Sequence, residues 1–284
     1  MEFSMFGLSL SWPWHPGTFV VLLMLAILYL IGLGRVRARQ ERVEVWRIIA
    51  FFAGLLMAAL FLLTPIDTIA RTQLFSVHMA QVVTLVTLCA PLLLFGSPAV
   101  LLRPLVELPL IRAIVRFLTF PLTATLLFNI SFVFWHLPLI YDRVVTDPTL
   151  YSVAVLSIFL ASLLNWWPLI GSLHELRRMS YPVQLLYVFL DGQPVDIYAL
   201  VLVFSMVPLY ANSTIPSQIG LSRFADQAVG GVLLLIPGLV DLAVMTPLFF
   251  RWLGLIEQKA KLDDERRQEE MALEEAWEEE DAEV

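Results

Sequence analysis

Seven long apolar segments, separated by short polar stretches, dominate the pattern of this chain. They cover residues 18–34, 46–64, 77–102, 114–135, 151–170, 184–207 and 227–252. Each is long enough to cross the hydrocarbon core of a bilayer as a helix. Because the loops between them are short, segments adjacent in sequence are expected to be antiparallel neighbours in space. The pattern predicts an all-α integral membrane protein built as a bundle of seven transmembrane helices.

The composition supports a membrane protein. Of the 284 residues 59% are hydrophobic and 15% are charged, whereas about 25% of an average soluble domain is charged. The basic residues are scattered over short loops, so the chain offers no nucleic-acid-binding surface. We therefore predict a transmembrane domain over residues 1–255.

Residues 256–284 form a separate, charged tail. Residues 257–284 hold 13 acidic and 4 basic side chains and contain neither Gly nor Pro. This composition predicts a solvated cytoplasmic helix that frays into an acidic end. A docking site for a basic partner is the alternative interpretation.

The distribution of Lys and Arg predicts the orientation of the bundle. Fifteen of the 18 basic residues lie on the side of the C-terminus, and the other three are Arg71, Arg143 and Arg223. Because cytoplasmic loops are enriched in Lys and Arg, the N-terminus is predicted outside and the C-terminus in the cytoplasm. The first apolar segment is followed by arginines instead of being preceded by them, so it is expected to stay as a helix and not to be cleaved as a signal peptide.

This topology gathers polar side chains at the predicted outer face. His78 begins the third segment there, His136 ends the fourth, and His15 lies in the external N-terminal stretch. Imidazoles are common ligands of copper and zinc, so a metal site there is chemically reasonable. The alternative is that these isolated histidines hydrogen-bond to nearby carboxylates or carbonyls and bind no metal. Other polar side chains expected at similar depth are Asp67, Gln81, Tyr141, Asp142, Asp226 and Gln227.

A second polar group lies inside the predicted bundle. The sixth segment contains LDGQPVD, with Asp191 and Asp196, and the seventh contributes Asp241. Pro194 is expected to kink the sixth helix. Because charged carboxylates are costly in lipid, these acids are expected to face the bundle interior. Two interpretations remain open: a relay for protons or ions, or structural pairing with Asn129, Asn165 or Arg177.

Six short motifs, taken in order, resemble those of a known family. They are WPWHP (12–16), HMAQ (78–81), APLLLFGSP (90–98), WHLPLIYD (135–142), NWWPLIG (165–171) and LSRFADQAVGGVLLLIPG (221–238). Their order and placement, over nearly all of residues 10–255, resemble the caa3-type cytochrome c oxidase assembly factor (CtaG) family of bacterial seven-helix membrane proteins.

The resemblance implies a role in the maturation of haem–copper terminal oxidases in the bacterial cytoplasmic membrane. The implied step equips the catalytic subunit with its active-site copper, without enzymatic activity, and the implied partners are oxidase subunits within the lipid bilayer. His78, Gln81, His136 and the Asp226–Gln227 pair match the family motifs.

Two positions depart from the family pattern. Val82 and Val155 stand where many members have histidine. The departures leave two hypotheses: either His15, His78 and His136 suffice to bind copper, or this protein scaffolds the oxidase without holding a metal.

Two hypotheses from other classes make different demands on the residues. A small proton- or ion-coupled transporter would use Asp191, Asp196 and Asp241. A haem-bearing membrane cytochrome needs axial histidines on facing helices, a requirement that only His78 and His136 would meet.

Overall fold

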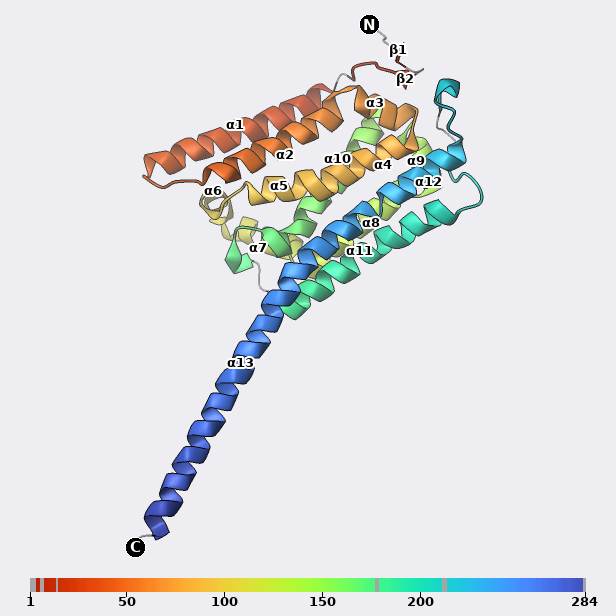
Figure 1. The fold of residues 1–284 in the computed structure, drawn as a ribbon. Helices are drawn as coiled ribbons and strands as arrows, with labels where there is room; N and C mark the ends of the chain where they lie inside the picture. The colour runs from red at the N-terminus through yellow and green to blue at the C-terminus, as the bar shows by residue number, and fades with distance from the viewer. Residues whose placement is uncertain (1–3, 6–7, 14, 177–178, 211–213, 283–284) are drawn as a thin grey trace.

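The structure is a computed structural model that describes residues 4–5, 8–13, 15–176, 179–210 and 214–282. Trp14 of the WPWHP motif, and Arg177 and Arg178 of a predicted inner loop, lie outside the described residues. A short antiparallel pair of strands, β1 (Ser4–Met5) and β2 (Leu8–Ser9), precedes a bundle of helices (Figure 1).

Long apolar helices make up the bundle, as the sequence predicts. Within the described part of the chain, six helical stretches are long and apolar enough to cross a membrane, or seven when a bent pair counts as one span. Four of them are single helices: α1 (Pro16–Ala38), α2 (Val45–Leu63), α10 (Pro148–Ile170) and α11 (Tyr181–Phe204). α11 continues through Pro194 without a break in its helical assignment. The chain is therefore a multi-pass membrane protein.

The third predicted segment is one stretch with an irregular centre. It consists of α4 (Phe75–Thr84), the π-helical turn η1 (Leu85–Cys89) and α5 (Ala90–Phe95). Pro91 has no backbone N–H to donate to the carbonyl of Thr87 four residues earlier, which accounts for a departure from α-helical bonding at this place. The stretch ends at Phe95 and not at residue 102, because Gly96, Ser97 and Pro98 interrupt it.

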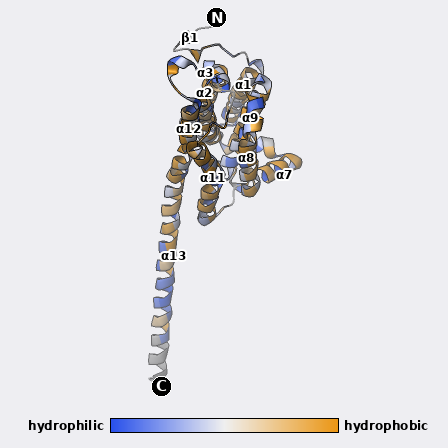
Figure 2. Cartoon of the chain, turned by 90° about the vertical axis from the view of Figure 1, so that its right-hand side faces the viewer, coloured by the Kyte–Doolittle hydropathy of each residue, from blue (hydrophilic) through white to orange (hydrophobic). Residues whose placement is uncertain are grey.

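The fourth predicted segment, residues 114–135, spans a break. It combines the end of α7 (Pro109–Leu118) with α8 (Pro121–His136), and the two helices are bent by 64°. Pro121 disfavours a helical conformation at Phe120, whose ψ of 131° is extended. α7 consequently projects sideways from the bundle (Figure 2).

The seventh predicted segment begins as α12 (Arg223–Leu233) and, after a short turn, continues as α13 (Ile236–Ala282). The described part of the acidic tail is helical as far as Ala282, and α13 continues without interruption far beyond the other helices (Figure 1). Its distal part is hydrophilic, whereas the bundle is largely hydrophobic (Figure 2).

Short helices connect the longer ones. They are α3 (Pro65–Thr72), α6 (Ala99–Leu102), η2 (Arg103–Val106), α9 (Pro138–Val144), η3 (His174–Leu176) and η4 (Ser217–Ile219).

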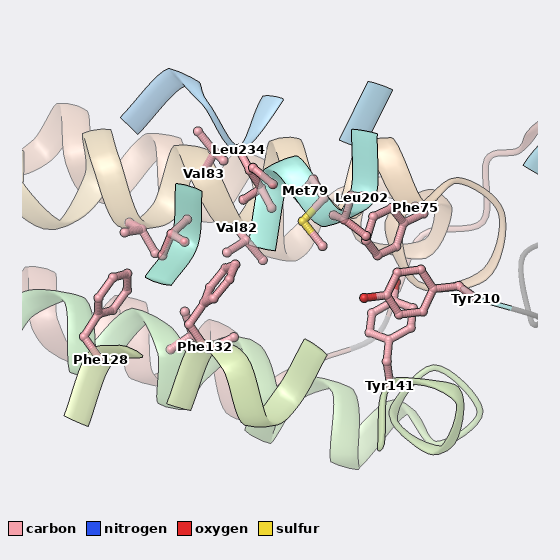
Figure 3. Packing of buried hydrophobic residues seen from close by; sticks show 14 of the residues in the cluster. Phe75, Met79, Val82, Val83, Phe128, Phe132, Tyr141, Leu202, Tyr210 and Leu234 are labelled. Carbon is pink, nitrogen blue, oxygen red and sulfur yellow. The ribbon is translucent and has the colours of Figure 1, made fainter. Parts of the chain in front are cut away.

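Two buried clusters hold the bundle together. One includes Phe75, Met79, Phe132 and Tyr141 and lies among α4, α8, α9 and α11 (Figure 3). The other lies among α1, α2, α5 and α10, where Tyr29 stacks on Phe51 with ring centroids 3.8 Å apart. The first cluster surrounds the end of the bundle at which α4 begins and α8 ends.

Two adjacent glycines allow α12 to pack closely against its neighbours. A Cβ atom added to Gly231 would lie 2.9 Å from the carbonyl oxygen of Ala199 in α11, and one added to Gly230 would lie 2.8 Å from the Phe75 ring in α4. A backbone carbonyl in a helix moves only together with the helix, so Gly231 sets the separation of α12 from α11.

Replacement of Gly231 by Ala is expected to destabilise the bundle. The new methyl group pushes α11 and α12 apart, and the free energy of unfolding is expected to fall by about 1–3 kcal/mol. Thermal unfolding of the purified protein in detergent, followed by intrinsic tryptophan fluorescence, measures the change. Gly254→Ala is the matched control, because nothing lies within 4 Å of its added Cβ and Ala favours a helix. Equal unfolding temperatures for the two variants would contradict this account.

Candidate metal centre

His78 and His136 meet inside the bundle. His78 lies in the first turn of α4, and His136 is the last residue of the antiparallel α8. Their Nε2 atoms are 3.2 Å apart, and the two side chains are 3% and 0% exposed. Tyr141 of α9 covers them, with its ring centroid 5.1 Å from that of His78. The pair is therefore enclosed by protein, whereas the sequence alone suggests histidines presented at the outer face.

The end of α8 positions His136. Leu137 is extended and Pro138 follows, so the helix ends at the histidine. The His136 Nδ1–H donates to the carbonyl oxygen of Phe132 at 2.7 Å. The hydroxyls of Tyr198 and Tyr210 each donate to the His136 carbonyl at 2.8 Å, which satisfies an acceptor that the helix end leaves open.

His78 belongs to a buried chain of hydrogen bonds. Its Nδ1 atom lies 2.8 Å from the hydroxyl of Tyr151 in α10, which donates to the Gln81 Oε1 atom at 2.6 Å. The Gln81 Nε2 atom in turn donates to the Phe61 carbonyl oxygen and to an Asp67 carboxylate oxygen, both at 2.8 Å. The chain thus connects four helices.

The partners of this chain assign the tautomer of His78. A backbone carbonyl only accepts, so the Phe61 carbonyl orients the amide of Gln81 with its oxygen towards Tyr151. The single hydroxyl proton of Tyr151 then goes to Gln81, and its oxygen accepts from the His78 Nδ1–H. The neutral His78 ring therefore has an unprotonated Nε2 atom.

The same reasoning applies to His136. Its Nδ1 atom carries the proton because it faces the Phe132 carbonyl, so its neutral ring also has an unprotonated Nε2 atom. Two lone pairs consequently face each other across 3.2 Å in a buried site. Two buried acceptors without a donor are costly, and a cation between them removes that cost. The arrangement is suited to binding a proton or a metal ion.

His15 lies apart from this pair. Its Nε2 atom is 3.0 Å from the Oδ2 atom of Asp67, so the sequence-predicted group of three histidines is not brought together. Burial raises the pKa of Asp67, and hydrogen bonds from Gln81 and His15 oppose that rise. In the residues that the structure describes, no group of three or more His, Cys, Asp or Glu is placed to hold a metal ion.

Asp226 and Gln227, two α12 residues of the predicted polar shell, bond to the backbone next to the histidine pair. The carboxylate of Asp226, in α12, accepts from the backbone N–H groups of Phe75 and Ser76 at 2.7 and 3.1 Å, and so caps the start of α4. The Gln227 Oε1 atom accepts from the Leu209 backbone N–H at 2.6 Å. These bonds hold the first turn of α4 and the segment after α11 beside the histidines.

The α9 residues of the predicted shell lie above the histidines. The ring of Tyr141 is nearly parallel to that of His136, with an interplanar angle of 15°. Burial is the main cause that raises the pKa of Tyr141 well above its usual range. Asp142 is the next residue of the same helix and is partly buried.

The two valines at family histidine positions are both buried in apolar packing. Val82, one turn after His78, is in the cluster around Met79. Val155, one turn after Tyr151, is in the cluster around Tyr29. Neither position contributes a polar group, so the candidate ligands that the described residues offer here are the two facing imidazoles.

The intramembrane acids form a separate group. Asp191 accepts from Thr125, Asn129 and Asn165, and the two asparagines are partners that the structural interpretation names. Asp196 and Asp241 line a cavity beside it.

Sequence reasoning missed the tyrosines of the site. Tyr151 joins His78 to Gln81, and Tyr198 and Tyr210 bind the His136 carbonyl. One signal was available for Tyr151: it lies four residues before Val155, so it shares a helical face with a position at which the family often has histidine.

These features define a class: a multi-pass helical membrane protein with a buried histidine pair near one end of its bundle. The family model for the cytochrome c oxidase caa3 assembly factor (Caa3_CtaG) matches residues 27–254. The chain belongs to this family, as its motifs suggest, and is a cytochrome c oxidase assembly factor that associates with the oxidase in the membrane. Comparisons with curated proteins and with solved structures give no match.

In the metal-free protein, we expect both His78 and His136 to carry a proton on Nδ1. Solid-state ¹⁵N NMR of histidine-labelled protein distinguishes the tautomers. Tyr151→Phe removes the oxygen that accepts from His78 Nδ1–H, so the His78 ring is then expected to carry its proton on Nε2 and donate to His136. Tyr198→Phe is the control, because the Tyr198 hydroxyl donates to the His136 backbone carbonyl and not to an imidazole nitrogen. An Nε2–H-only ring in the unsubstituted protein would contradict the assignment.

Proposed function

We propose that this protein is a non-enzymatic assembly factor of the bacterial cytoplasmic membrane that holds a copper ion between His78 and His136 on its way to a haem–copper oxidase. The observation that carries the proposal is the facing of two unprotonated Nε2 atoms in a buried site. Family membership connects the site to copper, because this protein is an assembly factor for cytochrome c oxidase and a haem–copper oxidase contains copper by definition.

The donor set suits copper. Imidazole nitrogen is a favoured ligand of copper ions. With metal–nitrogen bonds of about 2.0 Å, two nitrogens 3.2 Å apart can bind one ion in a bent arrangement without a large movement of either helix. Each ring is oriented by a hydrogen bond from its other nitrogen, as is usual for metal-binding histidines.

The predicted orientation places this site towards the outer face of the membrane. Three basic residues lie on the side of His78 and His136 and fifteen on the other, a bias that favours an outer location for the pair. A copper ion held there is available to an oxidase subunit that lies beside this protein in the same bilayer.

The two rival functions have less support. A haem between His78 and His136 requires a porphyrin plane between nitrogens that are only 3.2 Å apart, which leaves no room for it. The transporter hypothesis gains no support from the family match, and Asp191, one of its three acids, is occupied by hydrogen bonds from neighbouring helices.

Protein purified after copper-supplemented expression is expected to contain about one copper ion per chain. His78→Gln and His136→Gln each remove one of the two imidazoles and are expected to lower the copper content at least about tenfold. Atomic absorption spectrometry measures the content. His15→Gln is the control and is expected to retain copper, because His15 contacts Asp67 and not the pair.

Two results would contradict this assignment: equal copper in the unsubstituted protein and the two pair variants, or loss of copper from the His15 variant alone. The second result would move the metal towards Asp67.

Deletion of the protein is expected to leave an oxidase that lacks its full activity. The unsubstituted gene restores oxidase activity in isolated membranes, and the His78→Gln/His136→Gln double variant, expressed at the same level, does not. Oxygen consumption with reduced cytochrome c measures the activity, and total haem a measures the amount of enzyme. Full restoration by the double variant would indicate scaffolding without copper.

A further inference from the structure

A small cavity lined in part by acidic side chains lies in the bundle, and His78 and His136 are not among its lining residues. It has a volume of about 50 Å³, enough for the end of one side chain and too small for a lipid chain. Residues of α11, α13, η1 and α8 line it, and the carboxyl groups of Asp191, Asp196 and Asp241 are among the lining groups.

Two of these three carboxylates have no hydrogen-bond or ion-pair partner among the described residues. Asp191 is bonded to Asn129 and Asn165. Within the described part of the chain, neither Asp196 nor Asp241 accepts a hydrogen bond or faces a basic side chain within ion-pair distance. Such groups are costly in a membrane unless a donor reaches them.

A second observation points to a ligand of the same cavity. Thr87, in the π-helical turn η1, lines it, and the Thr87 hydroxyl is buried without a hydrogen-bond partner in the part of the chain that the structure describes. Its side chain is only 4% exposed. Buried hydroxyls normally have partners, so the Thr87 hydroxyl can pair with a polar group that enters this cavity.

Gly192 and Gly238 have no side chains that would occupy the space of the Asp196 and Asp241 carboxyl groups. A Cβ atom on Gly192 of α11 would lie 2.9 Å from an oxygen of Asp241, and one on Gly238 of α13 would lie 3.5 Å from an oxygen of Asp196. The two helices are therefore close enough for both carboxylates to reach the space between them. Figure 1 shows α11 and α13 side by side along the edge of the bundle.

The faces beside this cavity are apolar and exposed. Ile197 of α11 and Leu242 of α13 are each 60% exposed, and Leu239 is 67% exposed. Asp196 and Asp241 are themselves partly exposed. Because the family is membrane-embedded, the surface around these carboxylates meets lipid or another transmembrane helix.

The shape of the group favours a guanidinium over a metal ion. No three acids in the described residues converge closely enough to hold a metal. A guanidinium presents five N–H donors in a planar fork and so can bond to carboxylates that are spread apart, and it can also donate to a hydroxyl. An arginine on a neighbouring helix thus satisfies Asp196, Asp241 and Thr87 together.

We propose that this cavity and the exposed faces of α11 and α13 beside it form a groove that docks a partner's transmembrane helix, which inserts an arginine side chain among Asp196, Asp241 and Thr87. The surrounding apolar residues contact the rest of that helix. The docking chemistry is independent of copper binding. That the partner is an oxidase subunit rests on the proposed function.

The test uses the full chain in lipid nanodiscs and a synthetic Leu/Ala transmembrane peptide with one central arginine as the probe. Its matched control is the same peptide with glutamine in place of arginine. Fluorescence energy transfer between labelled protein and peptide measures binding. We expect the arginine peptide to bind at least about tenfold more tightly than the glutamine peptide. Equal binding of the two peptides would overturn the proposal, and this comparison needs no variant.

Variants locate the contact. Asp196→Asn and Asp241→Asn, alone and together, are expected to remove the preference for arginine, whereas Asp263→Asn/Asp264→Asn in the exposed tail leaves it intact. Retention of the preference by the Asp196→Asn/Asp241→Asn double variant would overturn the proposed site. A nanodisc dimer that the double variant dissociates would also overturn it, since the groove would then bind a second copy of this chain.

Co-isolation with the oxidase separates this inference from the copper proposal. The Asp196→Asn/Asp241→Asn variant is expected to retain copper and to lose oxidase subunits after cross-linking in membranes. A clear arginine preference in nanodiscs, combined with unchanged co-isolation, would contradict only the identification of the partner as the oxidase. If the variant lost both its copper and its co-isolation with the oxidase, the groove and the histidine pair would be one functional unit. That result would contradict the inference.

Discussion

The hydrogen bond from the Gln81 amide to the Phe61 carbonyl determines the direction of the bonds around the histidine pair. A carbonyl can only accept, so the amide oxygen turns towards Tyr151 and the tyrosine proton is used there. His78 must then donate through Nδ1, and its Nε2 atom is left to face His136. The contact between Phe61 of α2 and Gln81 of α4 thereby determines that the unprotonated Nε2 atom of His78 faces His136.

The low polarity of the bundle interior makes these hydrogen bonds decisive for the tautomers of the two histidines. In water a histidine exchanges tautomers freely, but inside a bundle each ring nitrogen has one neighbour and each neighbour has a fixed role. The Asp226 carboxylate has a comparable effect on the backbone, because it binds the first N–H groups of α4 and thus positions the turn that carries His78. Gly230 allows this by bringing α12 against Phe75 of α4.

Much of the architecture can be predicted from the sequence. Runs of apolar residues indicate the helices, and antiparallel order alone places the start of α4 beside the end of α8, so His78 and His136 were expected at one depth. The break at Phe120 was missed because the apolar pattern continues through Pro121. Tyr151 was missed because a tyrosine near a helix end usually marks the lipid interface. The role of Asp226 depends on a contact with residues about 150 positions earlier, which no local pattern reveals.

α13 is the longest element of the protein and one of the simplest. It has 47 residues and so extends for about 70 Å. A helix of this length is stiff along its axis, and α13 is joined through a single turn at Leu234 and Leu235 to α12, which holds the start of α4. The acidic end and His78 are therefore connected by one stiff rod, a turn and a capping carboxylate. An axial displacement of α13 would therefore act first on α12 and on the capped start of α4, without any contact with the histidines themselves.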